Sequence, residues 1–154
     1  MKELIDKTEE EIRRLRAQNY SCSQATFLGI CSVFGSRLTR QQQMDLAAGF
    51  RGGIGRSYNE GTCGALSAGI MALGCCLPED NEKAIALSKE MFDHFKREHG
   101  TVICGNIVQK YCYSRCTCCC LCAGTKAAEL LAREKCKTCL NDNENVEHTK
   151  KDLS

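Results

Sequence analysis

Apolar residues recur along the chain three and four positions apart, which is the spacing of an amphipathic helix. Residues 2–18 show this pattern first, with one stripe made by Leu4, Ile5, Ile12 and Leu15. No segment shows the strict alternation typical of a half-buried strand, and the chain has a single proline. The pattern therefore predicts an all-α protein.

Capping residues and glycine stops divide the rest of the chain into further helices. Ser21 and Thr39 are predicted N-caps, and Gly35 and Gly100 are predicted helix ends. The further helices cover about residues 22–34, 39–50, 62–76, 81–99, 103–111 and 120–135. We expect one compact bundle of six to seven helices in a single domain.

The predicted domain covers residues 1–140, a length that can build its own core. Residues 141–154 read NDNENVEHTKKDLS and have almost no apolar side chain. Such a segment has too little apolar surface to offset its ordering entropy. It is predicted to be a flexible polar tail.

Charge excludes several classes of partner. The 21 Lys and Arg nearly cancel the 19 Asp and Glu, and both signs are spread along the chain, so nothing indicates nucleic-acid binding. The first 18 residues are too charged for a secretory signal, and no apolar run approaches the roughly 18 residues of a membrane span. We expect a cytoplasmic protein that contacts neither membrane nor nucleic acid.

Cysteine is far more frequent than core packing requires. The chain has 14 cysteines, and six of them lie between Cys112 and Cys122. Because the cytoplasm keeps thiols reduced, this number favours metal binding or redox chemistry over a disulfide framework.

Four cysteines stand at predicted helix starts: Cys22, Cys63, Cys104 and one from the run Cys118 to Cys122. The free N–H groups and the positive dipole end of a helix N-terminus favour a thiolate over a thiol. Four converging starts would form a pocket for anionic sulfur. An iron–sulfur cluster or a cation would balance the charge of that pocket.

A glycine-rich loop, GFRGGIGRSYNEG, precedes Cys63. Its glycines let the main chain approach a ligand closely, and N–H groups there could donate hydrogen bonds to cluster or ligand sulfur. The candidate cofactor-binding residues are therefore Gly52, Gly53, Gly55 and Gly61.

The chain resembles the family of redox-active proteins named after the pattern C, GCAxxG, C, C, found mostly in anaerobic prokaryotes. The segments that carry the resemblance lie within residues 19–133: YSCSQATFLGI, LAAGFRGGIG with GTCGALSAGIMALG, FKREHGTVICGNIV, and a cysteine followed by GTKAAELLARE. The resemblance implies a small helical redox or metal-centre protein. Its four signature cysteines would correspond to Cys22, Cys63, Cys104 and Cys120.

The fourth position is open among Cys118, Cys119, Cys120 and Cys122. Cys120 is preferred for its distance to Ala127 and Ala128.

Three functions are compatible with these residues. The leading hypothesis is an iron–sulfur protein that passes single electrons to or from an unknown partner protein. The alternatives are a thiol–disulfide oxidoreductase and a structural or storage zinc protein without catalysis. Whether the protein is an enzyme stays open.

The other cysteines have two interpretations. A second metal site could be formed by Cys112, Cys116, Cys119 and Cys120, completed by Cys136 and Cys139. For Cys31, Cys75 and Cys76, which lie on or near apolar helix faces, we favour core packing. The small residues of GALSAGIMALG could permit close helix packing within the chain or in a homodimer.

Overall fold

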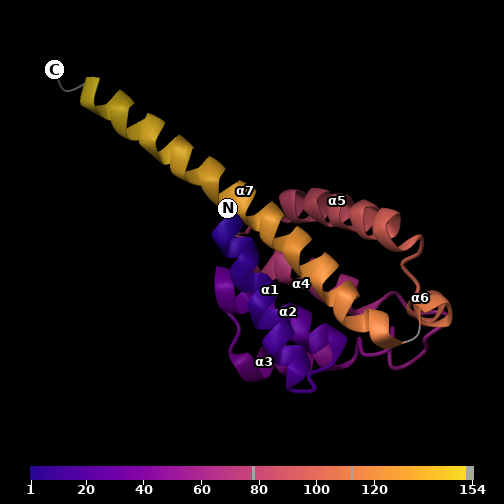
Figure 1. Ribbon diagram of the computed structural model, residues 1–154. Coiled ribbons are helices and arrows are strands. Elements are labelled where there is room, and N and C mark those ends of the chain that lie inside the picture. The colour runs from indigo at the N-terminus through magenta and orange to yellow at the C-terminus, as the bar shows by residue number, and fades with distance from the viewer. Residues whose placement is uncertain (78, 112, 152–154) are drawn as a thin grey trace.

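The computed structural model describes residues 1–77, 79–111 and 113–151, with side chains over 1–77, 79–110 and 114–137. Within these residues the chain forms seven α-helices, a short 3₁₀ helix and no strand beyond one isolated bridge (Figure 1). The helices are α1 (Lys2–Ala17), α2 (Cys22–Phe34), α3 (Arg40–Ala48), α4 (Gly64–Cys76), α5 (Asn81–His99), α6 (Cys104–Tyr111) and α7 (Cys116–Lys151), with the 3₁₀ helix at Tyr113–Arg115. The all-α prediction is confirmed.

The predicted caps are present. The Ser21 hydroxyl accepts a hydrogen bond from the Gln24 backbone amide at the start of α2, and Thr39 forms a capping box with Gln42 at the start of α3. Gly35 and Gly100 end α2 and α5 at positive φ, a backbone region that favours glycine.

The last helix is longer than predicted at both ends. α7 begins at Cys116 rather than near position 120, and it continues to Lys151 because no glycine or proline interrupts it after Gly124. Figure 1 shows its C-terminal part leaving the bundle. Residues 141–151 are thus helical; that they move freely stays a prediction, and residues 152–154 lie outside the described residues.

The second helix forms the centre of the bundle. α2 is buried almost all round and packs against α1, α4 and α7, while α3 packs on α2 and α5 packs on α4 and α7. Helix α1 approaches α2 closely because Gly29 has no side chain: a β-carbon there would lie 2.5 Å from Ile12 Cγ1. The packing brings the first turns of α2 and α4 to the same part of the molecule as the starts of α6 and α7.

No helix in the described part of the chain is long and apolar enough to cross a membrane.

A small ion-pair network joins α5 to α7. The Glu90 carboxylate accepts hydrogen bonds from Arg133 at 2.8 and 3.3 Å and pairs with Lys126 at 3.0 Å. The hydrogen bond from Arg133, which has the larger effect, and that from Lys126 lower the pKa of Glu90 from its ordinary value of 4.5 to about 2. The carboxylate side chain is 41% exposed, so solvent screens the pairs.

This network predicts a contribution to stability that depends on pH. A lowered folded-state pKa means that the stabilisation is complete above about pH 4.5 and is lost as the pH falls towards 2. Glu90→Gln should therefore cost about 1 kcal/mol at pH 7, with a smaller cost at pH 3. Urea denaturation at both pH values measures the difference. Glu3→Gln, which removes an exposed pair with Lys7, is the matched control and should cost less at either pH. An unchanged cost of Glu90→Gln at pH 3 would contradict the linkage.

Candidate functional site

The starts of α4 and α6 lie side by side. The Cys63 amide donates to the Val102 carbonyl at 2.7 Å, and the Cys104 amide donates to the Gly61 carbonyl at 2.8 Å. An isolated antiparallel bridge between residues 62 and 103 lies between these bonds. Two cysteines distant in sequence are thereby held next to each other by backbone contacts.

The start of α2 touches the start of α4. Cys22 is the first residue of α2, and a β-carbon added at Gly64 would lie 3.0 Å from its sulfur. Only glycine leaves room for this thiol next to Cys63, which is the N-cap of α4. The three cysteines predicted at the first three helix starts, Cys22, Cys63 and Cys104, therefore come together in the folded chain.

The glycine loop folds over this region and reaches one of the sulfurs. The backbone of Gly52 hydrogen-bonds the Cys22 sulfur, which lowers the pKa of that thiol against the larger effect of burial. The Gly55 amide is used inside the loop, where it donates to the Gly49 carbonyl at 2.8 Å. Gly53 and Gly61 pack against each other: a β-carbon on Gly53 would lie 3.0 Å from the Gly61 Cα. Gly53, Gly55 and Gly61 thus have evident roles in shaping the loop, and a cofactor role for the four glycines stays a prediction.

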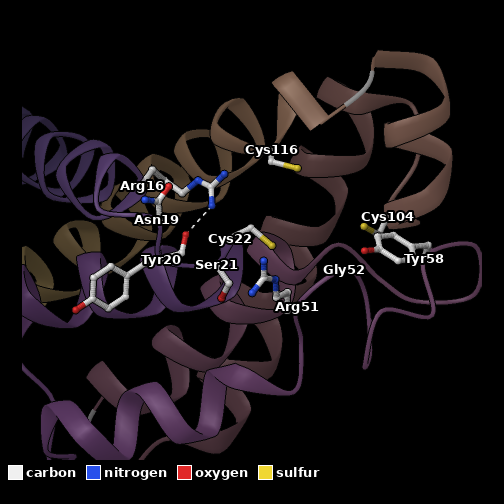
Figure 2. Close-up of a pocket in the computed structure, with 10 residues that line it drawn as sticks. All are labelled: Arg16, Asn19, Tyr20, Ser21, Cys22, Arg51, Gly52, Tyr58, Cys104 and Cys116. Atoms are coloured by element: carbon white, nitrogen blue, oxygen red, sulfur yellow. Dashed lines mark hydrogen bonds between the residues drawn. The ribbon is translucent and has the colours of Figure 1, made fainter.

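A cavity of about 320 Å³ opens among these helix starts. Figure 2 shows three of its lining residues, Cys22, Cys104 and Cys116, with their sulfurs directed into the space between them. Arg16 and Arg51 line the same cavity. Cys63 adjoins this wall and is nearly fully buried, at 6% exposure. The cavity wall therefore combines thiols from three helix starts with two cations, and the thiol of a fourth helix start, Cys63, adjoins it.

The structure brings Cys116, rather than Cys120, to the cavity wall. The expectation that the last helix starts near Cys120 is wrong, because α7 starts at Cys116. Cys120 is fully buried behind Cys22, with its thiol 3.6 Å from the Cys22 carbonyl oxygen. Cys116 is the first residue of α7, so it has the first-turn position expected of the fourth cysteine.

The predicted second metal site is not assembled by the described residues. Cys136 is exposed and lies on the same continuous helix as Cys116, twenty positions further on, which corresponds to about 30 Å. Two side chains so far apart cannot share a metal. The side chains of Cys112 and Cys139 lie outside the described residues. Among the described side chains, no three of Cys, His, Asp or Glu come together closely enough to hold a metal ion.

The thiols differ strongly in acidity. A hydrogen bond from the Cys119 thiol, helped by the backbone amides of Ala65 and Leu66, lowers the pKa of Cys63 to about 7. Burial raises the pKa of Cys104 to about 12 and also raises the pKa of Cys22 and Cys116. Cys63 is therefore the thiol of this group that ionises first.

Arg16 connects the cavity to α1 and α7. Its guanidinium donates to the Tyr20 carbonyl at 2.6 Å (Figure 2) and to the Thr117 hydroxyl at 3.3 Å. Its charge lowers the pKa of Cys22 and Cys116, against the larger effect of burial. No sequence signal indicates this role, since Arg16 is one of many charges on α1. Arg51 lies within the glycine loop next to Gly52, and this place in the sequence could have indicated its role at the cavity.

Comparison with known families finds a match over residues 20–149 with the family described as "Putative redox-active protein (C_GCAxxG_C_C)". The matched segment runs from the residues before α2 almost to the end of α7, so it contains all 14 cysteines. Comparisons with curated proteins and with solved structures found no match. The match confirms the resemblance read from the cysteine and glycine motifs, and the chain belongs to the C_GCAxxG_C_C family.

Proposed function

We propose that Cys22, Cys63, Cys104 and Cys116 bind an iron–sulfur cluster, and that the protein passes single electrons to or from a partner protein in the cytoplasm. The observation that carries this proposal is that three helix-start cysteines, Cys22, Cys104 and Cys116, line one cavity of about 320 Å³, with the helix-start cysteine Cys63 adjoining it. Helix N-termini supply N–H groups and positive potential, which stabilise the thiolate ligands that such a cluster requires.

The donor set fits a cluster better than a single zinc ion. A tetrahedral zinc site needs four donors that meet at about 2.3 Å from one point. Here three of the thiols are instead spread around the wall of a cavity and the fourth adjoins it, and a polynuclear cluster would fill such a space. Bound there, the cluster would supply a one-electron redox couple.

The surrounding residues would tune that couple. The backbone hydrogen bond from Gly52 to the Cys22 sulfur withdraws negative charge from a ligand, and Arg16 and Arg51 offset the charge of the whole site. Both effects would favour the reduced state of the cluster, which carries more negative charge than the oxidised state. The opening of this cavity is the place where a partner could exchange electrons.

The proposal is tested by analysis of protein prepared and reconstituted without oxygen. We expect about four iron and four sulfide per chain and broad absorption near roughly 400 nm. Colourless protein without iron would contradict the cluster. Stoichiometric zinc, together with unfolding by a chelator, would support the zinc protein instead.

Thiol–disulfide exchange is the second candidate, favoured by the pair Cys63 and Cys119. A thiolate hydrogen-bonded to a neighbouring thiol can attack a substrate disulfide, and the second thiol can then resolve the mixed disulfide. Two protein thiols are oxidised to one disulfide, and the substrate disulfide is reduced to two thiols.

The acidity of Cys63 can be checked in metal-free protein. With a pKa of about 7, its alkylation rate should rise about tenfold from pH 6 to pH 8 and level off above that. Quantitative mass spectrometry of the Cys63 peptide measures the rate. The Cys119→Ala variant lacks the hydrogen bond to Cys63, so the alkylation rate of Cys63 in this variant should keep rising up to pH 9. The same profile in both proteins would show that Cys119 does not activate Cys63.

A further inference from the structure

A second group of thiols lies away from the cavity, where α2 and α4 end. Cys31 is nine positions beyond Cys22 on α2, about 14 Å further along the helix. Cys75 and Cys76 are the last two residues of α4, which packs against α2. Core packing alone does not explain Cys75 and Cys76, because both are partly exposed.

Cys31 and Cys76 form a hydrogen-bonded pair in which one partner is buried and the other is accessible. Cys31 is 3% exposed, and its thiol donates to the sulfur of Cys76. Cys76 lines a cavity of about 210 Å³, together with Gly35, Ser36, Arg37, Cys75 and Leu77. A small molecule in this cavity would meet Cys76 first, with Cys31 behind it.

A cation stands beside the accessible sulfur. Lys135 is held near Cys76 because its ammonium donates to the Phe34 carbonyl at 3.3 Å and lies 5.2 Å from the centre of the Phe34 ring. The hydrogen bond from Cys31, and then the charge of Lys135, lower the pKa of Cys76. The pKa of Cys31 is raised by the same hydrogen bond and by burial. The accessible Cys76, which lines the cavity, is thus placed to attack a substrate, and the buried Cys31 is placed behind it to resolve the product.

We propose that Cys31 and Cys76 are a second redox-active dithiol, which reduces small disulfides that enter the cavity beside Cys76. The Cys76 thiolate attacks one sulfur of the substrate, whose S–S bond breaks, and the departing thiolate takes up a proton. The Cys31 thiol then loses its proton and attacks the Cys76 sulfur, which releases the second half of the substrate as a thiol. The products are two substrate thiols and one protein disulfide.

Cys75 provides the matched control within the chain. Consecutive residues of a helix do not face each other, so Cys75 cannot share the position of Cys76 opposite Cys31. Burial raises the pKa of Cys75, which leaves it a thiol at neutral pH. Because Cys75 lines the cavity, Cys75→Ser should change the rate of the reaction with the small disulfide but still form the Cys31–Cys76 disulfide, whereas Cys76→Ser should abolish it.

The experiment treats the reduced full-length protein with 2-hydroxyethyl disulfide and maps the products by mass spectrometry. Trypsin alone is insufficient, because residues 17–37 hold both Cys22 and Cys31 and residues 57–83 hold Cys63, Cys75 and Cys76. Chymotrypsin is added to cut after Phe27 and Leu66, which separates this pair from the central cysteines. We expect a cross-linked Cys31–Cys76 peptide in the wild-type protein and in Cys75→Ser.

The variants decide the outcome. Cys76→Ser should lose the cross-link, and Cys31→Ser should accumulate a mercaptoethanol adduct on Cys76, since no resolving thiol is left. Circular dichroism checks that each variant is folded, and the Cys75→Ser and Cys76→Ser comparison decides the question if the buried Cys31→Ser does not fold. A disulfide between Cys75 and Cys76, or full alkylation of Cys31 after treatment, would overturn the proposal.

Discussion

Replacement of Cys116 by serine is expected to leave anaerobically reconstituted protein without most of its iron, whereas Cys120→Ala should retain the wild-type iron content. Cys116 begins α7 and lines the cavity with Cys22 and Cys104. Serine keeps the size of the side chain but removes the sulfur ligand. Cys120 is fully buried and turned to the Cys22 carbonyl, so its loss removes packing and no ligand.

Iron and sulfide per chain, with absorption near roughly 400 nm, are measured for both variants and for Cys118→Ser. Cys118 is exposed and does not line the cavity, so its replacement controls for a general effect of losing one thiol from the cysteine run. If Cys120→Ala lost its iron and Cys116→Ser retained it, the fourth ligand would be Cys120 and not Cys116. Equal loss in all three would mean that the whole run holds the metal.

Three of the four central cysteines could be found from the sequence because each stands beside a strong local signal. Ser21 caps the helix of Cys22, and glycines surround Cys63. The helix of Cys104 follows the glycine that ends α5. Caps and glycine stops act through the nearest backbone groups, so they can be read without knowledge of the fold.

The fourth cysteine could not be found in this way. The run from Cys116 to Cys122 has neither a cap nor a stop at its beginning, and a 3₁₀ helix at Tyr113–Arg115 leads directly into α7. Similar side chains in succession do not mark where a helix starts. The start of α7 is instead set by tertiary contacts, such as the hydrogen bond from the Arg16 guanidinium to the Thr117 hydroxyl.

Pairs of thiols from different helices are also beyond what sequence patterns can predict. The contacts of Cys63 with Cys119, and of Cys31 with Cys76, depend on how α2, α4 and α7 pack. The interpretation of Cys31 and Cys76 as core residues rests on helix periodicity, which shows the buried face of a helix but not which side chain lies opposite.

Gly64→Ala is expected to destabilise the protein by about 2–3 kcal/mol, near the upper end of what overpacking costs. Gly64 is buried at the first position of α4, and its β-carbon would overlap with the Phe50 carbonyl oxygen and lie 3.0 Å from the Cys22 sulfur. The Phe50 oxygen belongs to the backbone, so it cannot be displaced as cheaply as the end of a flexible side chain. The loop or the start of α4 must shift, and Cys22 must shift with it.

Gly74→Ala makes the same chemical change in the same helix and should have the opposite sign. Gly74 is exposed near the end of α4, and a β-carbon added there would have no neighbour within 4 Å, so alanine gains about 0.5–1 kcal/mol from its higher helix propensity. Urea denaturation of metal-free protein compares the two variants without any contribution from a bound cluster. Destabilisation by both would mean that α4 tolerates no added methyl group anywhere. Stabilisation by both would show that the loop yields at Phe50, and that the close contact between the starts of α2 and α4 does not fix the position of Cys22.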